Sequence, residues 1–376
     1  MGEGAEGHLP VVIRQFEDLR VLLGPGVVEG LEEELARIGR HRALLVTGRS
    51  LASGDVGIRV ENALGRSHAG TYAQSRPHVP VGTVEEAWQK ARKVSADVVV
   101  GLGGGSPIGT AKAVAVRLPD EGPKAVDVVA VPTTYSGSEM TPIFGTTDDG
   151  RKTVVRDPRI RPRLVLYDPE LARDTPPQLT ASTGINAFAH CVEGLYSPTA
   201  GAEERTLALE GARLLFYHLP PSVRDPRNLL HRYRLFEGSM KAGLVLARAD
   251  MAIHHGLVHA LGGRFDLPHG LLNAVILPYA MRFNRFVGEA VYRDLAASLD
   301  LPVEGRSPAD IARMLIQAVE KFIEGLGLPR RLRDLGVPGA ELPTVAEEAL
   351  RSRAVQNNPR PVQGRGDVLG VLESAW

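Results

Sequence analysis

Cysteine is almost absent from this sequence, because Cys191 is the only one among 376 residues. A single cysteine forms neither an intrachain disulfide nor a cysteine-based zinc site, which favours a reducing, cytoplasmic compartment. No run approaches the roughly 20 apolar residues that a membrane-spanning helix needs. The first ten residues also lack the apolar segment of a signal peptide. We therefore expect a cytoplasmic protein that has no membrane partner.

An excess of charge is missing as well. The chain carries 44 Lys and Arg against 44 Asp and Glu, so its net charge is +0. Because no long basic run breaks this balance, nucleic acid is not an expected partner. A hydrophobic fraction of 43% and a charged fraction of 23% are ordinary for a folded chain and exclude disorder, collagen and coiled coil. The length suits two domains.

Two patterns divide the chain. Between residues 11 and 170, short Val- and Leu-rich runs alternate with helical spacing, which is typical of a parallel sheet covered on both faces. The expected strands are 43–47, 97–102, 126–131 and 163–167. The later pattern is helical, for example over 207–217, 290–299 and 311–326. We predict a loose tail over 1–10, a dinucleotide-binding α/β domain over 11–170 and an all-α domain over 171–376.

A glycine-rich turn, Gly103-Gly104-Gly105-Ser106, follows the second predicted strand and precedes a helix expected to open at Gly109. Backbone N–H groups and the helix dipole can hold a phosphate at such a turn, and glycine lets the ligand approach closely. The turn matches neither G-x-G-x-x-G nor a Walker A loop. A tight turn without a ligand is therefore an equal alternative.

A second polar loop follows the next strand and contains Thr133, Thr134 and Ser138. Their hydroxyls can bond ribose or phosphate oxygens, although Ser138 could instead only cap a following turn. Two polar loops at the carboxyl ends of adjacent parallel strands favour a nucleotide site. After the first strand, Gly48 and Arg49 stand where an acid would select the unphosphorylated cofactor. We interpret them as permitting a 2′-phosphate, with a surface arginine as the alternative.

Histidines gather at helical spacing in the second half. His190 lies four residues after Asn186, and His259 lies four residues after His255, so each pair shares one helical face. His269 stands near an expected helix start. Imidazoles that converge from separate helices bind a divalent metal or transfer protons. Histidines that are merely satisfied in the core are the alternative.

These motifs together resemble the iron-dependent alcohol dehydrogenase superfamily over residues 11–370. The turn at 103–106 is similar to its GGGS turn, residues 132–134 to its PTT loop, and the last three histidines to its H-x₃-H-x₉-H segment. The resemblance implies a cleft between the two domains, NADH or NADPH as cofactor, and Lys152 near the nicotinamide ribose. The implied cofactor-binding residues are Gly48, Gly103, Gly104, Gly105, Ser106, Thr133, Thr134, Ser138 and Lys152.

Two departures resemble the maleylacetate reductase branch of that superfamily. Asn186 stands where metal-dependent members have an aspartate, and Gly109 replaces the aspartate of GGGSxxD. Longer stretches similar to the branch are 132–142, 150–153, 156–158 and 358–361. The implied activity is NAD(P)H-dependent reduction of maleylacetate, a small dicarboxylate, to 3-oxoadipate in the degradation of aromatic compounds. Exposed helical faces make a homodimer the expected assembly.

The resemblance also implies roles for the cleft histidines. His259 is the expected proton donor or carbonyl polariser, and His269 the expected partner of a substrate carboxylate or carbonyl. His190 and His255 complete the catalytic set, whereas His254 points about 100° away from His255 on a helix and is left out. Weak candidate partners of the substrate carboxylates, for each of which a solvated surface position is the favoured interpretation, are Arg151, Arg156 and Arg248.

A metal would find its ligands in Asn186, His190, His255 and His269. Because the amide of Asn186 is neutral, binding of iron or zinc should be weaker, and we expect activity without a metal. Three histidines can still hold zinc. The alternatives are a metal-dependent alcohol or aldehyde dehydrogenase, a dehydroquinate synthase-like lyase, and a non-catalytic nucleotide-binding protein. Asn186 and Gly109 argue against the first, and the lack of an acid-rich ligand set against the second.

Overall fold

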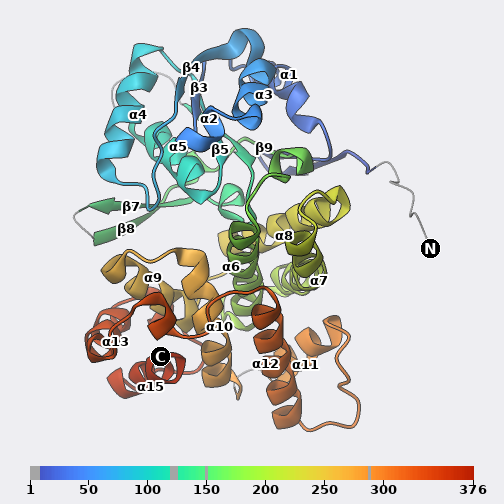
Figure 1. Ribbon diagram of the computed structural model, residues 1–376, viewed down its shortest axis with the longest axis vertical. Helices are drawn as coiled ribbons and strands as arrows, with labels where there is room; N and C mark the ends of the chain where they lie inside the picture. The colour runs from blue at the N-terminus through green and yellow to red at the C-terminus, as the bar shows by residue number, and fades with distance from the viewer. Residues whose placement is uncertain (1–8, 119–125, 149–150, 287–288) are drawn as a thin grey trace.

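The computed structural model describes residues 9–118, 126–148, 151–286 and 289–376, without the side chains of Arg151 and Lys152. Residues 1–8 of the predicted tail lie outside this description. The sheet and its helices form one part of the molecule, and a group of helices forms the other (Figure 1). The last strand of the sheet ends at Tyr167 and the first long helix begins at Pro177. The division into two domains at residue 170 stays a prediction.

The main sheet has seven strands in the order β1-β2-β9-β6-β5-β3-β4. All four predicted strands are present: β3 (Ala43–Val46), β5 (Val98–Gly103), β6 (Asp127–Pro132) and β9 (Leu164–Tyr167). The strands that the sequence did not reveal are β1 (Val12–Phe16), β2 (Leu19–Leu23) and β4 (His68–Tyr72). The sheet is parallel except at β1, which runs antiparallel to β2.

The strands are apolar throughout because helices cover both faces of the sheet. Leu45 and Val100 pack with α1 (Leu31–Arg37) and α3 (Asp55–Leu64) on one face. Leu44 and Val99, the preceding residues, pack with α4 (Val81–Lys93) and α5 (Gly105–Arg117) on the other. Successive side chains of a strand point to opposite faces, so both must be apolar here. The helix expected to open at Gly109 in fact begins at Gly105.

The strand order creates a crevice at the carboxyl edge of the sheet. From β3 the chain moves outward to β4 and then returns across β3 to β5. Ligands of open α/β sheets bind where the strand order reverses in this way. The ends of β3, β5 and β6 therefore lie side by side at this edge. A separate ribbon of β7 (Ile143–Asp148) and β8 (Arg151–Arg156) lies between the sheet and α9 (Figure 1).

The second part of the molecule is helical, as predicted. Its long helices are α6 (Pro177–Tyr196), α7 (Ala202–Arg224), α8 (Leu229–Arg248), α9 (Ile253–Phe265), α10 (His269–Asn284), α11 (Glu289–Ser298) and α12 (Pro308–Gly325). The remaining helices of this part are α13 (Leu342–Leu350), α14 (Arg353–Gln356) and α15 (Arg365–Ala375), whereas α2 (Arg49–Ala52) belongs to the sheet part. Among the described residues, none of the helices is long and apolar enough to cross a membrane.

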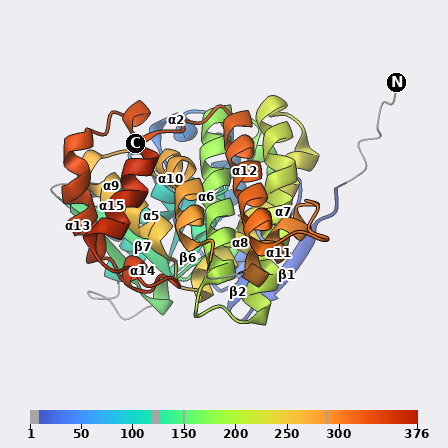
Figure 2. The ribbon, with the colours of Figure 1, turned by 90° about the horizontal axis from the view of Figure 1, so that it is seen from below.

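Helix α6 runs through the middle of this part, with α10 beside it (Figure 2). Most of its length is buried, including Cys191, which packs in the core. Seen from below, α13 and α15 lie on one side of this pair and α7, α11 and α12 on the other (Figure 2). Polar side chains on α6 are therefore enclosed by protein and must find their partners there.

A buried arginine joins the two parts. The Arg232 guanidinium, on α8, is fully buried and donates to the Tyr135 hydroxyl at 2.8 Å and to the Thr180 hydroxyl at 2.9 Å. Further donations reach the carbonyl oxygens of Pro226 at 3.0 Å and Thr175 at 3.3 Å. The loop after β6, the segment before α6, and α8 therefore share one hydrogen-bonding centre.

Candidate active site

The glycine turn brings the β5 loop against the β6 loop. Gly103 has φ of 130°, which side chains rarely tolerate, and its carbonyl accepts the Thr133 N–H at 3.0 Å. No side chain caps the start of α5 after Gly104. The first backbone N–H groups of this helix are therefore left to face the crevice. This is the arrangement that binds phosphate in other α/β proteins.

Hydroxyl groups of the second loop surround that turn. A Cβ atom placed on Gly104 would lie 3.1 Å from Thr134 Oγ1, and one on Gly105 would lie 3.6 Å from Ser138 Oγ. The hydroxyl of Ser138 is buried and makes no hydrogen bond to any described residue. The following 3₁₀ turn is preceded by Gly137, so the interpretation of Ser138 as a cap is wrong. A buried hydroxyl beside an uncapped helix start suits a ligand oxygen.

Lys112 is a residue of this region that sequence reasoning missed. Its Nζ atom is fully buried and donates to the carbonyl oxygens of Ser138 at 2.6 Å, Thr141 at 2.7 Å and Ile143 at 3.0 Å. Burial lowers the pKa of Lys112 to about 7. The lysine ties the second loop to α5. The sequence feature that could have revealed it is a single lysine within the otherwise apolar run 111–116.

The other predicted cofactor residues stand at the edge of the crevice. Gly48 precedes α2 at the end of β3, directly after Thr47, whose buried hydroxyl makes no hydrogen bond to a described residue. Arg49 is exposed and donates to Gln74 Oε1 at 3.2 Å. Lys152 pairs through its backbone with Thr147 in the β7–β8 ribbon, but its side chain lies outside the description. The role given to Lys152 stays a prediction.

The predicted histidines do come together from three helices. The ring centroids of His190 on α6 and His255 on α9 lie 4.6 Å apart and stacked. His269, at the start of α10, lies 5.9 Å from His255 and 5.3 Å from His259. The spacing at four residues on α9 and the turn to α10 thus build one cluster. Asn186 lies one helical turn before His190 on α6.

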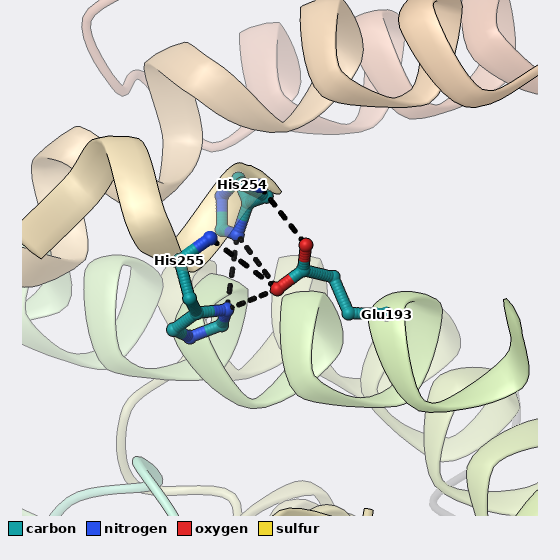
Figure 3. A group of neighbouring side chains, drawn as sticks. All are labelled: Glu193, His254 and His255. Carbon is teal, nitrogen blue, oxygen red and sulfur yellow. Dashed lines mark hydrogen bonds and ion pairs between the residues drawn. The ribbon is translucent and has the colours of Figure 1, made fainter. Parts of the chain in front are cut away.

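Glu193 lies beneath this cluster and was missed by sequence reasoning. Its buried carboxylate accepts from His255 Nδ1 at 2.6 Å and from the backbone N–H groups of His254 at 3.0 Å and His255 at 3.3 Å (Figure 3). Burial would raise the pKa of Glu193, but its interactions with the side chains of His254 and His255 outweigh burial and hold the pKa below its ordinary value. The sequence feature that could have revealed Glu193 is an acidic residue three positions after His190 in an otherwise apolar helix.

The hydrogen bonds assign the neutral tautomer of His255. His254 Nε2 lies 3.1 Å from the carbonyl oxygen of Asn273, which only accepts, so this nitrogen carries the proton. His254 Nδ1 then offers a lone pair to His255 Nδ1 at 3.2 Å. Because His255 Nδ1 also faces Glu193, it carries the proton and its Nε2 holds the lone pair. A neutral His255 would therefore present its lone pair at Nε2, which is the form that a base or a metal ligand needs. His254, left out of the cleft set, supports it from beneath.

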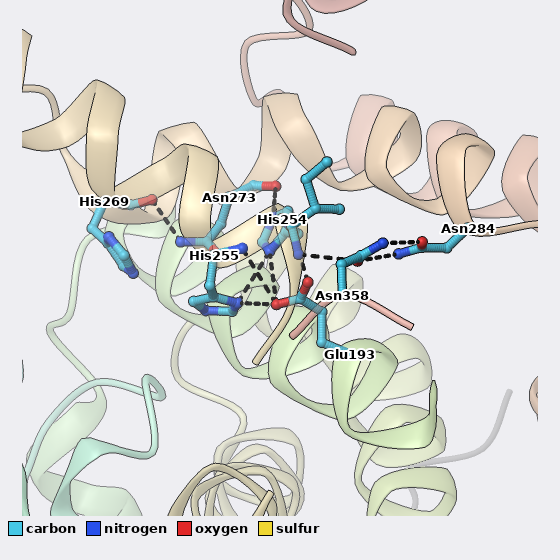
Figure 4. Close-up of polar contacts among 8 residues, drawn as sticks. Glu193, His254, His255, His269, Asn273, Asn284 and Asn358 are labelled. Carbon is cyan, nitrogen blue, oxygen red and sulfur yellow. Dashed lines mark hydrogen bonds and ion pairs between the residues drawn. The ribbon is translucent and has the colours of Figure 1, made fainter. Parts of the chain in front are cut away.

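The start of α9 is also held by residues 358–361 of this chain, the stretch that resembles the maleylacetate reductase branch. Asn358 Oδ1 accepts the Ile253 N–H at 3.2 Å, and its amide exchanges two hydrogen bonds with Asn284 at 2.8 and 3.0 Å (Figure 4). Figure 4 shows this amide pair and Glu193 on the same side of His254. The helix that carries His255 and His259 is thus anchored to both α6 and the C-terminal segment.

Some atoms of the predicted ligand set are available to a divalent cation. Asn186 Oδ1 and His190 Nδ1 are buried and make no hydrogen bond to any described residue. Burial, followed by the neighbouring His255, lowers the pKa of His190 well below its ordinary value, so this imidazole is neutral. Together with His255 Nε2, these atoms are nitrogen and oxygen donors of the kind that binds zinc or iron, whereas the described acid and histidine atoms that lie within 4.8 Å of one another are those of Glu193, His254 and His255. The expectation of metal-independent activity finds no support in this geometry.

Neither Arg156 nor Arg248 is among the described residues that line the cleft pocket. Arg156 donates to the Ala247 carbonyl at 3.1 Å, and Arg248 pairs with Glu203 at 2.7 Å; the Arg151 side chain is not described. A pocket of about 360 Å³ beside His269 is instead lined by His78, Thr147, Arg264 and Asp266, among others. His78 and Arg264 were not found from the sequence, because only the fold brings residues 78 and 264 together.

Comparison with known proteins fits these features. The model described as "Iron-containing alcohol dehydrogenase" matches residues 19–169, and the one described as "Fe-containing alcohol dehydrogenase family, C-terminal" matches residues 180–376. The chain belongs to the iron-containing alcohol dehydrogenase family. It is therefore an oxidoreductase, and the resemblance drawn from its motifs is confirmed.

The similarity of the chain to individual members of the iron-containing alcohol dehydrogenase family is more specific. Maleylacetate reductase 1 of Rhodococcus opacus is 37% identical over 357 residues, covering 95% of this chain and 94% of the relative. The crystal structure of maleylacetate reductase from a Rhizobium species superposes with a TM-score of 0.84 at 34% identity, covering 98% of each chain. A 1,3-propanediol oxidoreductase has a TM-score of 0.90 at 27% identity, covering 98% and 100%. Backbone shape thus groups both kinds of enzyme, whereas sequence identity is higher to the maleylacetate reductases.

Proposed function

We propose that the protein reduces maleylacetate to 3-oxoadipate with NADH or NADPH. The observation that carries this proposal is the identity of 36–40% to several relatives named maleylacetate reductase. The cleft supports it with a phosphate-type turn on one side and a histidine cluster on the other. Asn186, one of the two residues on which the resemblance to the branch rests, lies one helical turn before His190 of that cluster.

The reaction needs a hydride, a proton and a group that stabilises negative charge. In maleylacetate the ketone is conjugated to the double bond, so a bound reduced nicotinamide would supply its hydride to the carbon β to the ketone. The ketone oxygen then gathers charge as an enolate, and a proton delivered to the α carbon gives 3-oxoadipate. His259 and His269 are the proposed polariser and proton donor. Neutral His255 serves as base or ligand, because its only N–H is given to Glu193.

A metal would add one element to this scheme. Asn186, His190, His255 and His269 would hold it, and a bound divalent cation would polarise the ketone oxygen as a Lewis acid. Among the residues of this chain, Glu193 keeps the His255 Nε2 lone pair turned toward the site. The family name and the donor set both favour testing for such a cation.

One observation favours a second candidate function. Some atoms of the predicted ligand set are available to a divalent cation, and the 1,3-propanediol oxidoreductase superposes with a TM-score of 0.90. A metal-dependent alcohol or aldehyde dehydrogenase would share both features. Oxidation of simple alcohols that requires iron or zinc would favour this candidate.

The deciding experiment follows the nicotinamide absorbance. Purified protein is mixed with maleylacetate and with NADH or NADPH, before and after removal of metals by EDTA. We expect rapid oxidation of the cofactor and formation of 3-oxoadipate. A rate lost with EDTA and restored by iron or zinc assigns the cation a part in turnover. No turnover of maleylacetate, together with metal-restored turnover of aldehydes, would establish the second candidate instead.

A further inference from the structure

We propose that His78 binds the substrate carboxylate that is remote from the ketone. In the absence of substrate, the carboxylate of Asp266 occupies that position beside His78. The inference rests on the proposed function and adds a specificity residue to it. His78 comes from the sheet side of the cleft and Asp266 from the α9–α10 turn. Their side chains meet across the cleft, with His78 Nε2 3.5 Å from Asp266 Oδ1.

The pocket beside these residues suits a small dicarboxylate. It measures about 360 Å³ and is lined by His78 and Thr147 on one side and by His269 on the other. Thr147 pairs through its backbone with Lys152, the residue predicted near the nicotinamide ribose. A substrate in this pocket would thus lie between the predicted hydride donor and the histidine cluster. Its second carboxylate needs a hydrogen-bond donor of its own.

Comparison of His78 with the other basic side chain of the pocket, Arg264, favours His78 for this task. Arg264 is held by two glutamates, with Glu341 at 2.6 Å and Glu348 at 2.7 Å. The Asp266 side chain is 88% exposed, and an exposed pair at 3.5 Å contributes little to stability. A substrate carboxylate can therefore replace that of Asp266 on His78 without leaving a buried charge unpaired.

The backbone that presents His78 and the backbone that presents Asp266 both adopt an unfavourable conformation. His78, Val79 and Asp266 have φ of 61°, 48° and 51°, in the left-handed region that non-glycine residues rarely adopt. Strain of this kind persists where the surroundings enforce it, and it clusters at ligand sites. The Thr147 N–H fixes the loop by donating to the Val79 carbonyl at 3.1 Å.

Gly109 makes room for this loop. A Cβ atom on Gly109 would lie 3.1 Å from Val79 Cγ2, so a larger side chain there would push Val79 away. Gly109 is one of the two positions at which the sequence departs from the superfamily pattern. The glycine and the histidine loop are therefore parts of one arrangement, which presents His78 to the pocket.

The test compares two single variants whose effects should be opposite. His78→Asn removes the imidazole donor, and Asp266→Asn removes the competing carboxylate; asparagine tolerates the left-handed backbone at both positions. We expect His78→Asn to raise KM for maleylacetate about 10- to 100-fold, as loss of a charge-assisted hydrogen bond predicts. Asp266→Asn should lower that KM, and neither variant should change KM for the cofactor. His41→Asn, at an exposed histidine of the sheet domain, is the matched control.

Other outcomes separate the possible failures. If the pair were only a structural latch, both variants would shift KM in the same direction, and the proposal would be wrong. An unchanged KM in His78→Asn, with wild-type protein active on maleylacetate, would overturn the inference and leave the proposed function intact. No turnover by the wild type would refute the proposed function first. Calorimetric binding of adipate, a dicarboxylate of the same length, repeats the comparison without turnover: it should weaken in His78→Asn and strengthen in Asp266→Asn.

Discussion

His255 donates its Nδ1 proton to the Glu193 carboxylate over 2.6 Å, and this bond decides which nitrogen of the ring meets the cleft. The carboxylate also accepts two backbone N–H groups at the start of α9, so it fixes both the ring and the helix that carries it. Carboxylates that orient a histidine from behind are usual in metal and proton-transfer sites. Glu193 is accordingly as important to the site as the histidines predicted from the sequence.

Glu193→Gln should damage turnover more than cofactor binding. The glutamine amide can accept with one atom only, so its NH₂ group must face an N–H donor of residue 254 or 255. We expect kcat to fall about 10- to 100-fold, as for other outer-shell partners. Steady-state kinetics at saturating NADPH measures this, with Glu210→Gln, a change at the exposed Lys241 pair, as control. A wild-type kcat in Glu193→Gln would refute the positioning role.

Asn186→Asp should strengthen metal binding. The substitution turns a neutral amide oxygen into an anionic ligand within the same donor set, and carboxylate charge offsets part of the cost of dehydrating the ion. We expect at least about a tenfold rise in zinc affinity, measured by titration against a competing chelator. Asn186→Ala, which removes the oxygen, should bind more weakly than wild type. Equal affinities in all three proteins would show that residue 186 is no ligand.

Ser138→Ala should weaken cofactor binding without destabilising the fold. Because the Ser138 hydroxyl makes no hydrogen bond to a described residue, its removal breaks none in the folded chain. If it bonds the cofactor, Kd for NADPH should rise by about three- to tenfold, which corresponds to about 1 kcal/mol. Fluorescence titration gives Kd, and thermal unfolding gives Tm. Ser374→Ala on α15 serves as a remote control. A lower Tm with unchanged Kd would contradict the expectation.

Lys112 should make stability rise with pH. Its pKa is lowered from 10.5 to about 7 in the folded protein, so between these values the unfolded chain binds more protons. The free energy of unfolding from this group therefore increases from about pH 7 toward pH 10.5, by a few kcal/mol at most. Urea unfolding at pH 7.5 and 9.5 measures the increase, which should be absent in Lys112→Met. A variant with the same pH slope as wild type would show that Lys112 stays charged.

Much of the fold could be predicted because the buried strands can be recognised in the sequence. The four central strands are continuous apolar runs, which only a two-sided sheet requires. Edge strands were missed for the opposite reason: β1 carries Arg14 and Gln15, and β4 carries His68, so their patterns are mixed. Helix α7 was predicted too short because it continues through Pro220 and Pro221.

The site was predictable where residues follow one another on a helix. The pairs Asn186–His190 and His255–His259 could be placed by spacing alone. Glu193 and Lys112 were not foreseen, because a single buried charge shows its partners only when distant segments are folded together. The same holds for His78 and Asp266, which lie on opposite sides of the cleft. The homodimer and the cytoplasmic location stay predictions.

The buried guanidinium of Arg232 has a mechanical consequence. It is held by uncharged oxygens from the loop after β6, from the segment before α6, and from the turn before α8. Pulling these segments apart would strand a cation in the interior, which is costly. These segments must therefore stay together for the fold to hold, so Arg232 fixes the floor of the cleft.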